Sequence, residues 1–376
     1  MGIKPDTMFF AQNQEPEEMM PNNLRLYHKM RQQFCQWLPK ERSTRIRNMA
    51  LFITGLYLSG QSHLSKIVRT WPLPGKLPSL TNRLWRFLNN PNMVVEAWYA
   101  PVAQAIIQRL PDRPLTLVVD TTKVGFYHRL LSIGVAFKKR TLPLAWSIHR
   151  GRKGHTSTAE QLALFKQVAK ILPRKAEIWV VGDTEFQSVH LLRWFSRRNW
   201  HFVIRQQGKN KVRWQGQAWI KISTLPLKEG QTNVIGWVRL TEKHNAGWYW
   251  LLLHWETGED EPWYLVADRP GKTSLLKVYR KRMWVEEMYG DLKGHGFDLE
   301  ATHLQDAARI SRLVLGFCIV FVWLITLGSW VVKRGYRHLV DHKSRRDKSY
   351  FRIGWDWLER CFSLHRPIPL RFNPIF

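Results

Sequence analysis

The hydrophobic positions of the first hundred residues recur with the spacing of amphipathic helices. Five helices are predicted, at residues 24–37, 41–58, 62–71, 80–88 and 94–110. Ser79 is placed as the N-cap of the fourth helix, because a serine hydroxyl can accept from the free N–H groups of a first turn. Residues 62–88 have the outline of a helix-turn-helix unit whose second helix would turn Asn82, Arg83 and Arg86 towards DNA bases and phosphates. The outer face of an ordinary helical bundle would carry the same polar residues.

After residue 114 the hydrophobic positions change to the alternation of strands. The predicted elements are strands at 115–122, 125–137 and 140–148, a helix at 156–171, a strand at 177–181, a helix at 188–197 and a strand at 201–206. Residues 207–262 are rich in Gly, Thr and Trp and alternate in the same way, which predicts an antiparallel β insertion. Residues 263–268 are expected to return to the main sheet. The order of elements predicts a mixed α/β fold.

Polar residues with a helical spacing follow the insertion, between residues 278 and 294. No proline interrupts this stretch, and Gly294 provides a stop signal, so a continuous helix is predicted. Tyr279, Arg282, Glu286 and Lys293 would fall within an arc of roughly 60° on one face, at about 100° per residue. A solvated charged face is the simpler explanation of this pattern.

Two predicted strands end in an acid, which changes that picture. Asp120 closes the apolar run that begins at Leu115, and Asp183 closes the run that begins at Glu177. An acid at the carboxyl end of a buried strand lies at the edge of a sheet, where binding groups gather, although it can also simply cap the next turn. Together with Glu286, two such aspartates could converge. Three converging carboxylates require a cation, and hard oxygen ligands suit Mg²⁺ or Mn²⁺.

These motifs resemble those of a known family. The spacing Tyr279-x2-Arg282-x3-Glu286-x6-Lys293 is similar to the Tyr-Arg-Glu-Lys signature of family-four insertion-sequence transposases in the Asp-Asp-Glu superfamily. Asp120-Thr121-Thr122 resembles the first-aspartate motif of that group, and Asp183-Thr184-Glu185 resembles the second, with Thr184 in place of the usual Arg. The resemblance covers about residues 110 to 300.

The resemblance implies an RNase H-like catalytic core with a β-rich insertion and a helical N-terminal DNA-binding domain. Asp120, Asp183 and Glu286 would hold two divalent ions, Mg²⁺ or Mn²⁺, for in-line displacement at phosphorus. Arg282, Lys293 and Tyr279 would hold phosphates beside the scissile bond. The resemblance further implies a multimeric complex, expected to be a homodimer, that brings two transposon ends together and joins them to target DNA, all of it double-stranded. It places Trp263 where relatives rest an unstacked base on a tryptophan, although packing under the insertion explains Trp263 equally well.

Composition agrees with a nucleic-acid partner. The chain has 58 Lys and Arg against 29 Asp and Glu, a net charge of +29, and the cations are spread along its length. An anionic membrane surface is the rival partner. The three cysteines lack zinc spacing and indicate a reducing compartment, so we expect a cytoplasmic, nucleoid-associated protein. We expect no membrane partner and no small-molecule substrate.

The predicted domains follow from these changes in pattern. A flexible segment at 1–23 precedes a helical DNA-binding domain at 24–110, and the core at 111–206 and 263–335 encloses the insertion at 207–262. A basic tail at 336–376 completes the chain. Residues 313–332 carry no charge and are long enough to span a membrane, but a buried core helix is favoured there. A nuclease without strand transfer and a non-catalytic DNA-binding protein remain alternatives to a transposase.

Overall fold

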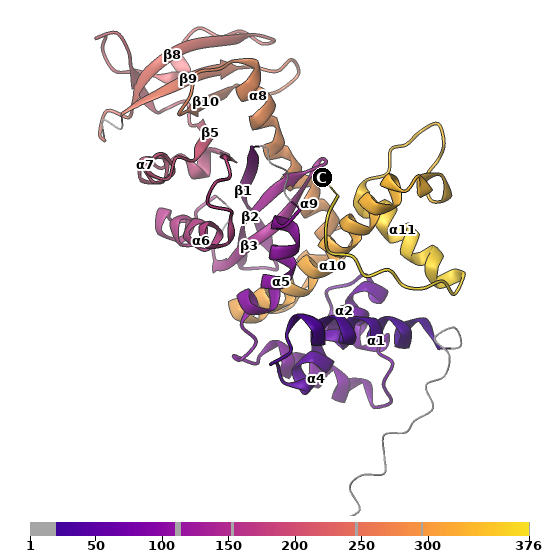
Figure 1. Ribbon diagram of the computed structural model, residues 1–376. Helices are drawn as coiled ribbons and strands as arrows, with labels where there is room; N and C mark the ends of the chain where they lie inside the picture. Colours follow the sequence, from indigo (N-terminus) through magenta and orange to yellow (C-terminus); the bar gives the residue numbers. More distant parts are fainter. Residues whose placement is uncertain (1–19, 110–113, 152–153, 245–246, 295, 376) are drawn as a thin grey trace, which may run out of the picture.

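The computed structural model describes residues 20–109, 114–151, 154–244, 247–294 and 296–375. Within them the chain is a mixed α/β protein built on one ten-stranded sheet, with helices packed against the sheet and a helical bundle at one end (Figure 1). This architecture confirms the predicted fold class. The predicted flexible segment 1–23 falls mostly outside the described residues, and the first helix begins at Asn22.

Five helices form the N-terminal bundle: α1 (Asn22–Trp37), α2 (Ser43–Ser59), α3 (Leu64–Arg69), α4 (Leu77–Leu88) and α5 (Val95–Ile107). Phe34, Phe52 and Trp98 are among the side chains that fill its centre. The start of α4 differs from the prediction, because Pro78 suits a first helical turn and the helix therefore begins at Leu77, with Lys76 as its N-cap. The expected N-cap role of Ser79 was wrong.

The main sheet begins as an antiparallel meander and continues with parallel strands. Its elements are β1 (Leu115–Val124), β2 (His128–Phe137), β3 (Arg140–Arg150), α6 (Thr158–Ile171), β4 (Ile178–Gly182), α7 (Val189–Arg197) and β5 (His201–Gln206). β1 pairs antiparallel with β2 and parallel with β4, and β4 pairs parallel with β5. β1 thus lies in the interior of the sheet and is buried along nearly its whole length.

The insertion extends this same sheet. Its strands are β6 (Lys211–Arg213), β7 (Ile220–Lys221), β8 (Thr232–Leu240) and β9 (Trp248–His254), and β10 (Trp263–Ala267) joins them to the core by pairing with both β9 and β5. The strand order is β3-β2-β1-β4-β5-β10-β9-β8-β6-β7. In Figure 1 the insertion forms the lobe at the far end of the sheet from the helical bundle.

The stretch predicted as one helix from 278 to 294 is interrupted in the structure. It consists of α8 (Thr273–Tyr279), a 3₁₀ segment η4 (Arg280–Met283) and α9 (Trp284–Leu292). The 3₁₀ segment packs against β1 and β4, which favours its tighter turn over a continuous α-helix. The prediction of a single regular helix was therefore wrong, and Lys293 lies just beyond the end of α9.

The apolar stretch 313–332 belongs to α10 (Ala307–Lys333), which runs through the middle of the protein (Figure 1). Of the described helices, α10 alone is long and apolar enough to cross a membrane, but 89% of its most apolar stretch is buried inside the protein. α11 (Tyr350–Ser363), from the predicted basic tail, packs closely along it. At this contact a Cβ on Gly354 would collide with the carbonyl oxygen of Leu324.

Candidate active site

The sheet places the two aspartates side by side. β1 and β4 run parallel with Val118 opposite Val181, so continuing this register by two residues brings Asp120 level with Asp183. Asp120 is 1% exposed, whereas Asp183 lies just past the end of β4, where its carboxylate accepts from the backbone N–H of Glu185 at 2.9 Å. The parallel pairing of β1 with β4 therefore places two of the three predicted acids next to each other.

Glu286 completes the cluster from α9, with Arg282 between it and the aspartates. An Nη atom of Arg282 lies 2.5 Å from a carboxylate oxygen of Glu286, and the other Nη lies 3.7 Å from an oxygen of Asp120 and 3.7 Å from an oxygen of Asp183. Only 13% of the Arg282 side chain is exposed. The structure thus brings the three predicted acids around a single positive charge.

The environment of Arg282 holds it in its charged form. Burial alone would lower the pKa of the guanidinium, but Asp120, Tyr279, Asp183 and Glu286 around it keep its pKa above the usual value. Tyr279 lies beside the same cluster and is only 3% exposed, and burial raises its pKa to about 12. Its hydroxyl therefore stays protonated at neutral pH and acts only as a neutral hydrogen-bonding group.

The chemistry of the three acids fits a hard divalent cation, while their present spacing does not. Carboxylate oxygens are the ligands that Mg²⁺ and Mn²⁺ take in proteins. Yet within the described ranges no three His, Cys, Asp or Glu side chains are grouped closely enough to hold a metal ion. Arg282 accounts for this, because its guanidinium lies among the acids where a cation would sit. The acids can gather around a metal only if Arg282 turns away.

Lys293, the remaining member of the predicted helical face, and Trp263 on β10 both have contacts close to the cluster. The ammonium group of Lys293 donates to the Thr122 hydroxyl at 2.8 Å and pairs with Glu300 at 2.6 Å. Thr122 is two residues after Asp120 on β1, so both side chains leave the same face of the sheet. Trp263 is half-buried, with its ring 5.1 Å from that of Tyr279 and 5.4 Å from that of His254.

The N-terminal residues predicted to read DNA do not all face the same way. Asn82 and Arg86 are exposed on α4. Arg83 instead turns back onto the bundle, where its Nε donates to the Asn48 side chain at 2.9 Å. The structure thus separates Arg83 from the two outward residues.

Two residues without a predicted role support the aspartates. One carboxylate oxygen of Glu185 accepts from the Thr121 hydroxyl at 2.6 Å and the other accepts from the Thr156 backbone N–H at 2.8 Å, which ties β1 to the loop before α6. Tyr289, on α9, donates to the backbone carbonyl of Asp120 at 3.1 Å. The sequence signals were the position of Glu185 two residues after Asp183 and that of Tyr289 one helical turn after Glu286.

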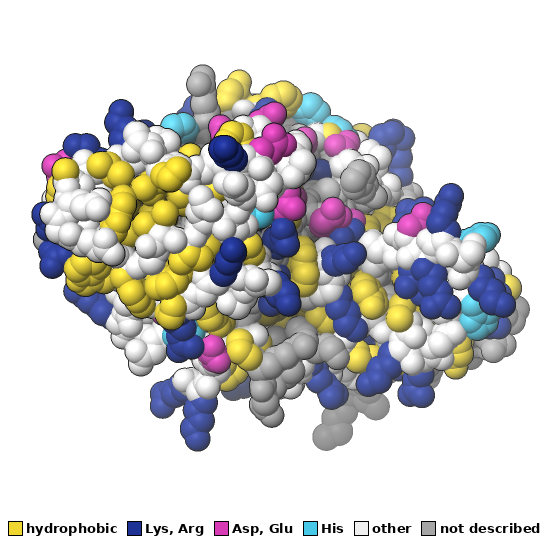
Figure 2. Space-filling view, turned by 90° about the horizontal axis from the view of Figure 1, so that it is seen from above, with side chains coloured by type: hydrophobic (Ala, Val, Ile, Leu, Met, Phe, Trp, Pro, Cys, Tyr) yellow, Lys and Arg dark blue, Asp and Glu magenta, His cyan; other side chains and the backbone are white. Residues whose placement is uncertain are grey.

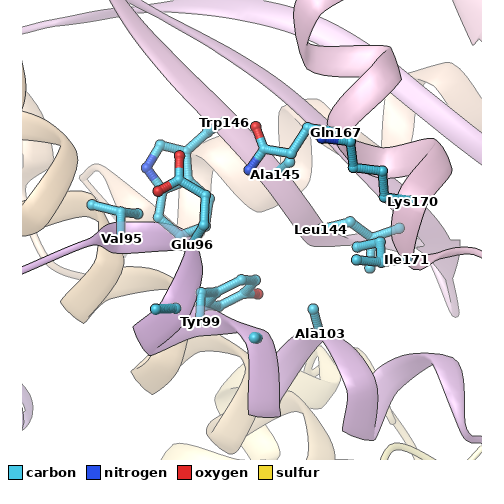
Figure 3. A pocket seen from close by; sticks show the side chains of 12 residues that line it. Val95, Glu96, Tyr99, Ala103, Leu144, Ala145, Trp146, Gln167, Lys170 and Ile171 are labelled. Atoms are coloured by element: carbon cyan, nitrogen blue, oxygen red, sulfur yellow. The ribbon is translucent and has the colours of Figure 1, made fainter. Parts of the chain in front are cut away.

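Two of the hollows in the described part of the protein differ in character. One, of about 520 Å³, begins at Thr184 beside Asp183 and is lined by polar and cationic side chains that include Arg205, Lys209 and Lys221. The other, of about 410 Å³, lies among α5, β3 and α6 and has mostly apolar walls, with Glu96 and Lys170 at its margin (Figure 3). None of the predicted site residues lines the second hollow.

The surface of the insertion is more apolar than its strand pattern suggests. Trp214, Trp219 and Trp250 are partly covered or contact neighbouring groups, but Trp237 is 43% exposed and Trp248 is 52% exposed. In Figure 2, which looks down on this end of the molecule, hydrophobic side chains gather on one lobe and Lys and Arg on the other. Both exposed tryptophans still contact neighbouring groups, since the Trp237 ring lies 5.7 Å from that of Trp250 and the Arg239 guanidinium lies 5.2 Å from the Trp248 ring.

Two strand-end aspartates and a helical glutamate on a mixed sheet define a protein of the Asp-Asp-Glu type. The chain belongs to the family of the transposase DDE domain, whose family model matches residues 116–323, more than half of its length. The matched region contains all three acids and the whole insertion. The family is that of a transposition enzyme acting in DNA recombination.

Comparison with other proteins adds little detail to this assignment. No protein of curated function matches the chain. Among solved structures, the cryo-EM structure of a piggyBac transposase synaptic complex with hairpin DNA is similar, with 11% sequence identity and a TM-score of 0.43. The likeness covers 91% of this chain and 80% of that one. The family assignment rests on the domain match.

Proposed function

We propose that this protein is a DNA transposase of the family-four-like group with the Tyr-Arg-Glu-Lys signature, which binds transposon ends, cuts them and joins them to target DNA. The observation that carries the proposal is the convergence of Asp120, Asp183 and Glu286 on Arg282. Three acids from separate elements around one cationic group are suited to handling a charged phosphate together with divalent cations.

In this proposal each residue of the cluster has its own task. Asp120, Asp183 and Glu286 would hold two divalent ions, Mg²⁺ or Mn²⁺, which would supply an activated hydroxyl and stabilise the leaving oxygen. Arg282 leaves the acids and binds a phosphate next to the scissile bond, because a guanidinium pairs with phosphate in a two-pronged geometry. Lys293 offers a second positive charge beyond Thr122. Tyr279 donates a hydrogen bond from a neutral hydroxyl.

Double-stranded DNA is the partner that the charge favours. The net charge of +29 suits a polyanion, and the polar hollow beside Asp183 presents Arg205, Lys209 and Lys221 for a phosphate backbone approaching the acids. Asn82 and Arg86 on α4 are candidates for contacts with the specific end sequence. We further propose that two copies assemble on a pair of ends, in the cytoplasm at the nucleoid.

The experiment that tests this function measures whether a cleaved DNA 3′ end is joined to a second DNA molecule. The protein is incubated with Mg²⁺, a labelled duplex carrying the sequences that flank its gene, and an unlabelled supercoiled plasmid. A transposase transfers the labelled 3′ end into the plasmid, so label appears in open-circular and linear plasmid bands. Cleavage of the duplex with no label in plasmid would identify a nuclease without strand transfer. Binding with neither product would indicate a non-catalytic DNA-binding protein.

A further inference from the structure

The turn between β1 and β2 holds two large aromatic side chains out into solvent. Phe126 is 65% exposed and Tyr127 is 61% exposed, and their ring centroids lie 6.3 Å apart. Two other rings adjoin them, since His303 lies 6.1 Å from Phe126 and His63 lies 5.1 Å from His303. We call these four residues the aromatic turn cluster. Single exposed aromatics are ordinary, but adjacent ones backed by further rings form a surface suited to stacking.

The backbone under this cluster is firmly held. Gly125 has φ 55°, and a Cβ there would lie only 3.3 Å from the carbonyl oxygen of Thr302, so the turn sits directly against the chain that follows α9. On the other side the N–H of Gly151 donates to the carbonyl of Tyr127 at 2.9 Å. The rings are therefore presented on a fixed support, which lowers the entropy lost when a ligand binds.

The charges around the cluster favour a polyanion over an apolar partner. Lys123 on β1 and Arg150 at the end of β3 are both exposed, and the strand register puts each next to the turn. Further along β1, Lys293 reaches Thr122 on the face that also carries Asp120. Lys293 therefore lies beside the acidic cluster, and Lys123 and Arg150 lie beside the aromatic turn cluster.

The distance between Asp120 and the aromatic turn cluster predicts which base pair of a bound DNA duplex the cluster would contact. Phe126 lies in the turn just past β1, which ends at Val124, four residues after Asp120, so at about 3.3 Å per residue the turn begins roughly 13 Å from Asp120. A DNA duplex advances about 3.4 Å per base pair, so this span together with the turn corresponds to roughly four to five base pairs. We propose that the aromatic turn cluster is a nucleobase-stacking site that engages DNA at a distorted step about four to five base pairs from the scissile phosphate at the acidic cluster.

This inference rests on the proposed function, because it takes DNA as the substrate of the acidic cluster. The test uses duplexes with the fluorescent base 2-aminopurine placed at each position from three to nine base pairs from the cut, without divalent metal so that no cleavage occurs. Stacking of Phe126 or Tyr127 at a distorted step changes the fluorescence of the wild-type complex in a narrow window about four to five base pairs from the cut. The double variant Phe126→Ala, Tyr127→Ala loses this change and binds roughly tenfold more weakly, as expected for the loss of base stacking.

Matched variants and a salt series separate the possible outcomes. Trp237→Ala removes an exposed aromatic on the insertion and should leave the fluorescence window intact. The double variant should keep the salt dependence of wild-type binding, because it removes no phosphate contact. If wild-type protein binds DNA with a steep salt dependence but the double variant matches it in fluorescence and affinity, the stacking site is refuted while the proposed function stands. If wild-type protein binds no DNA, the proposed function fails. If the double variant instead changes the sedimentation of the DNA-free protein, the cluster is a contact between copies.

Discussion

Arg282→Gln should make the DNA-free protein bind a divalent cation more tightly while it cuts DNA more slowly. In the structure the guanidinium lies among the three acids, so a metal ion must displace it before it can bind. Glutamine is shorter and uncharged and leaves the acids free to gather around the metal. The same substitution removes the proposed phosphate contact, which lowers cleavage.

The size of the effect follows from the contacts that the guanidinium gives up. Hydrogen bonds to charged groups contribute about 1.5–3 kcal/mol, and the lower end applies to Glu286, which is 48% exposed. The longer contacts of Arg282 with Asp120 and Asp183, at 3.7 Å, add a smaller attraction to that of Glu286. The total free energy required to move Arg282 away from the acids is then about 2–3 kcal/mol. Since about 1.4 kcal/mol corresponds to tenfold, the variant should bind metal about 30- to 100-fold more tightly.

Titration of DNA-free protein with Mn²⁺, followed by electron paramagnetic resonance, measures this directly. Arg280→Gln is the matched control, because Arg280 lies two residues away and pairs with Glu256 at 2.6 Å. The Arg280→Gln substitution removes the same charge but no contact with the three acids. It should therefore change the Mn²⁺ affinity by less than about threefold. Equal Mn²⁺ affinities for wild type and Arg282→Gln, or an equal gain in both variants, would refute the reasoning.

Three further outcomes follow from other parts of the molecule. Gly354→Ala should destabilise the fold by about 1–3 kcal/mol in thermal melts, because the new methyl group collides with α10, whereas Gly294→Ala meets open space and should not. The pair Asn82→Ala, Arg86→Ala should reduce the preference for end sequences in competition binding and leave nonspecific binding in place, and an unchanged preference would move recognition elsewhere. Trp263→Ala should slow double-strand release more than the first nick, and equal slowing of both steps would assign Trp263 to packing alone.

The sequence was sufficient to predict the order of the elements and the two aspartates. Both follow from local patterns, since an apolar strand that ends in an acid can be recognised one strand at a time. The parallel pairing of β1 with β4, which sets Asp120 level with Asp183, also follows once the order of elements is known. Glu286 was singled out by its spacing from Tyr279, Arg282 and Lys293, although the continuous helix predicted for these residues does not form.

What the sequence did not indicate depends on tertiary contacts. The 3₁₀ segment Arg280–Met283 forms where the chain packs on β1 and β4, and no residue in it breaks a helix by its own preference. The position of Arg282 among the acids depends on that segment. Continuation of the main sheet into the insertion depends on β10 pairing on both of its edges, which strand patterns do not encode.

The central claim is that Asp120, Asp183 and Glu286 form one catalytic cluster, and the most direct measurement compares cleavage with binding in the same variants. Asp120→Asn, Asp183→Asn and Glu286→Gln keep the size of each side chain and remove its charge. Each should abolish Mg²⁺-dependent cleavage of DNA that carries the end sequences, while DNA affinity is kept because cations supply most of it. Wild-type cleavage rates in any one of the three variants, with DNA binding intact, would contradict the account.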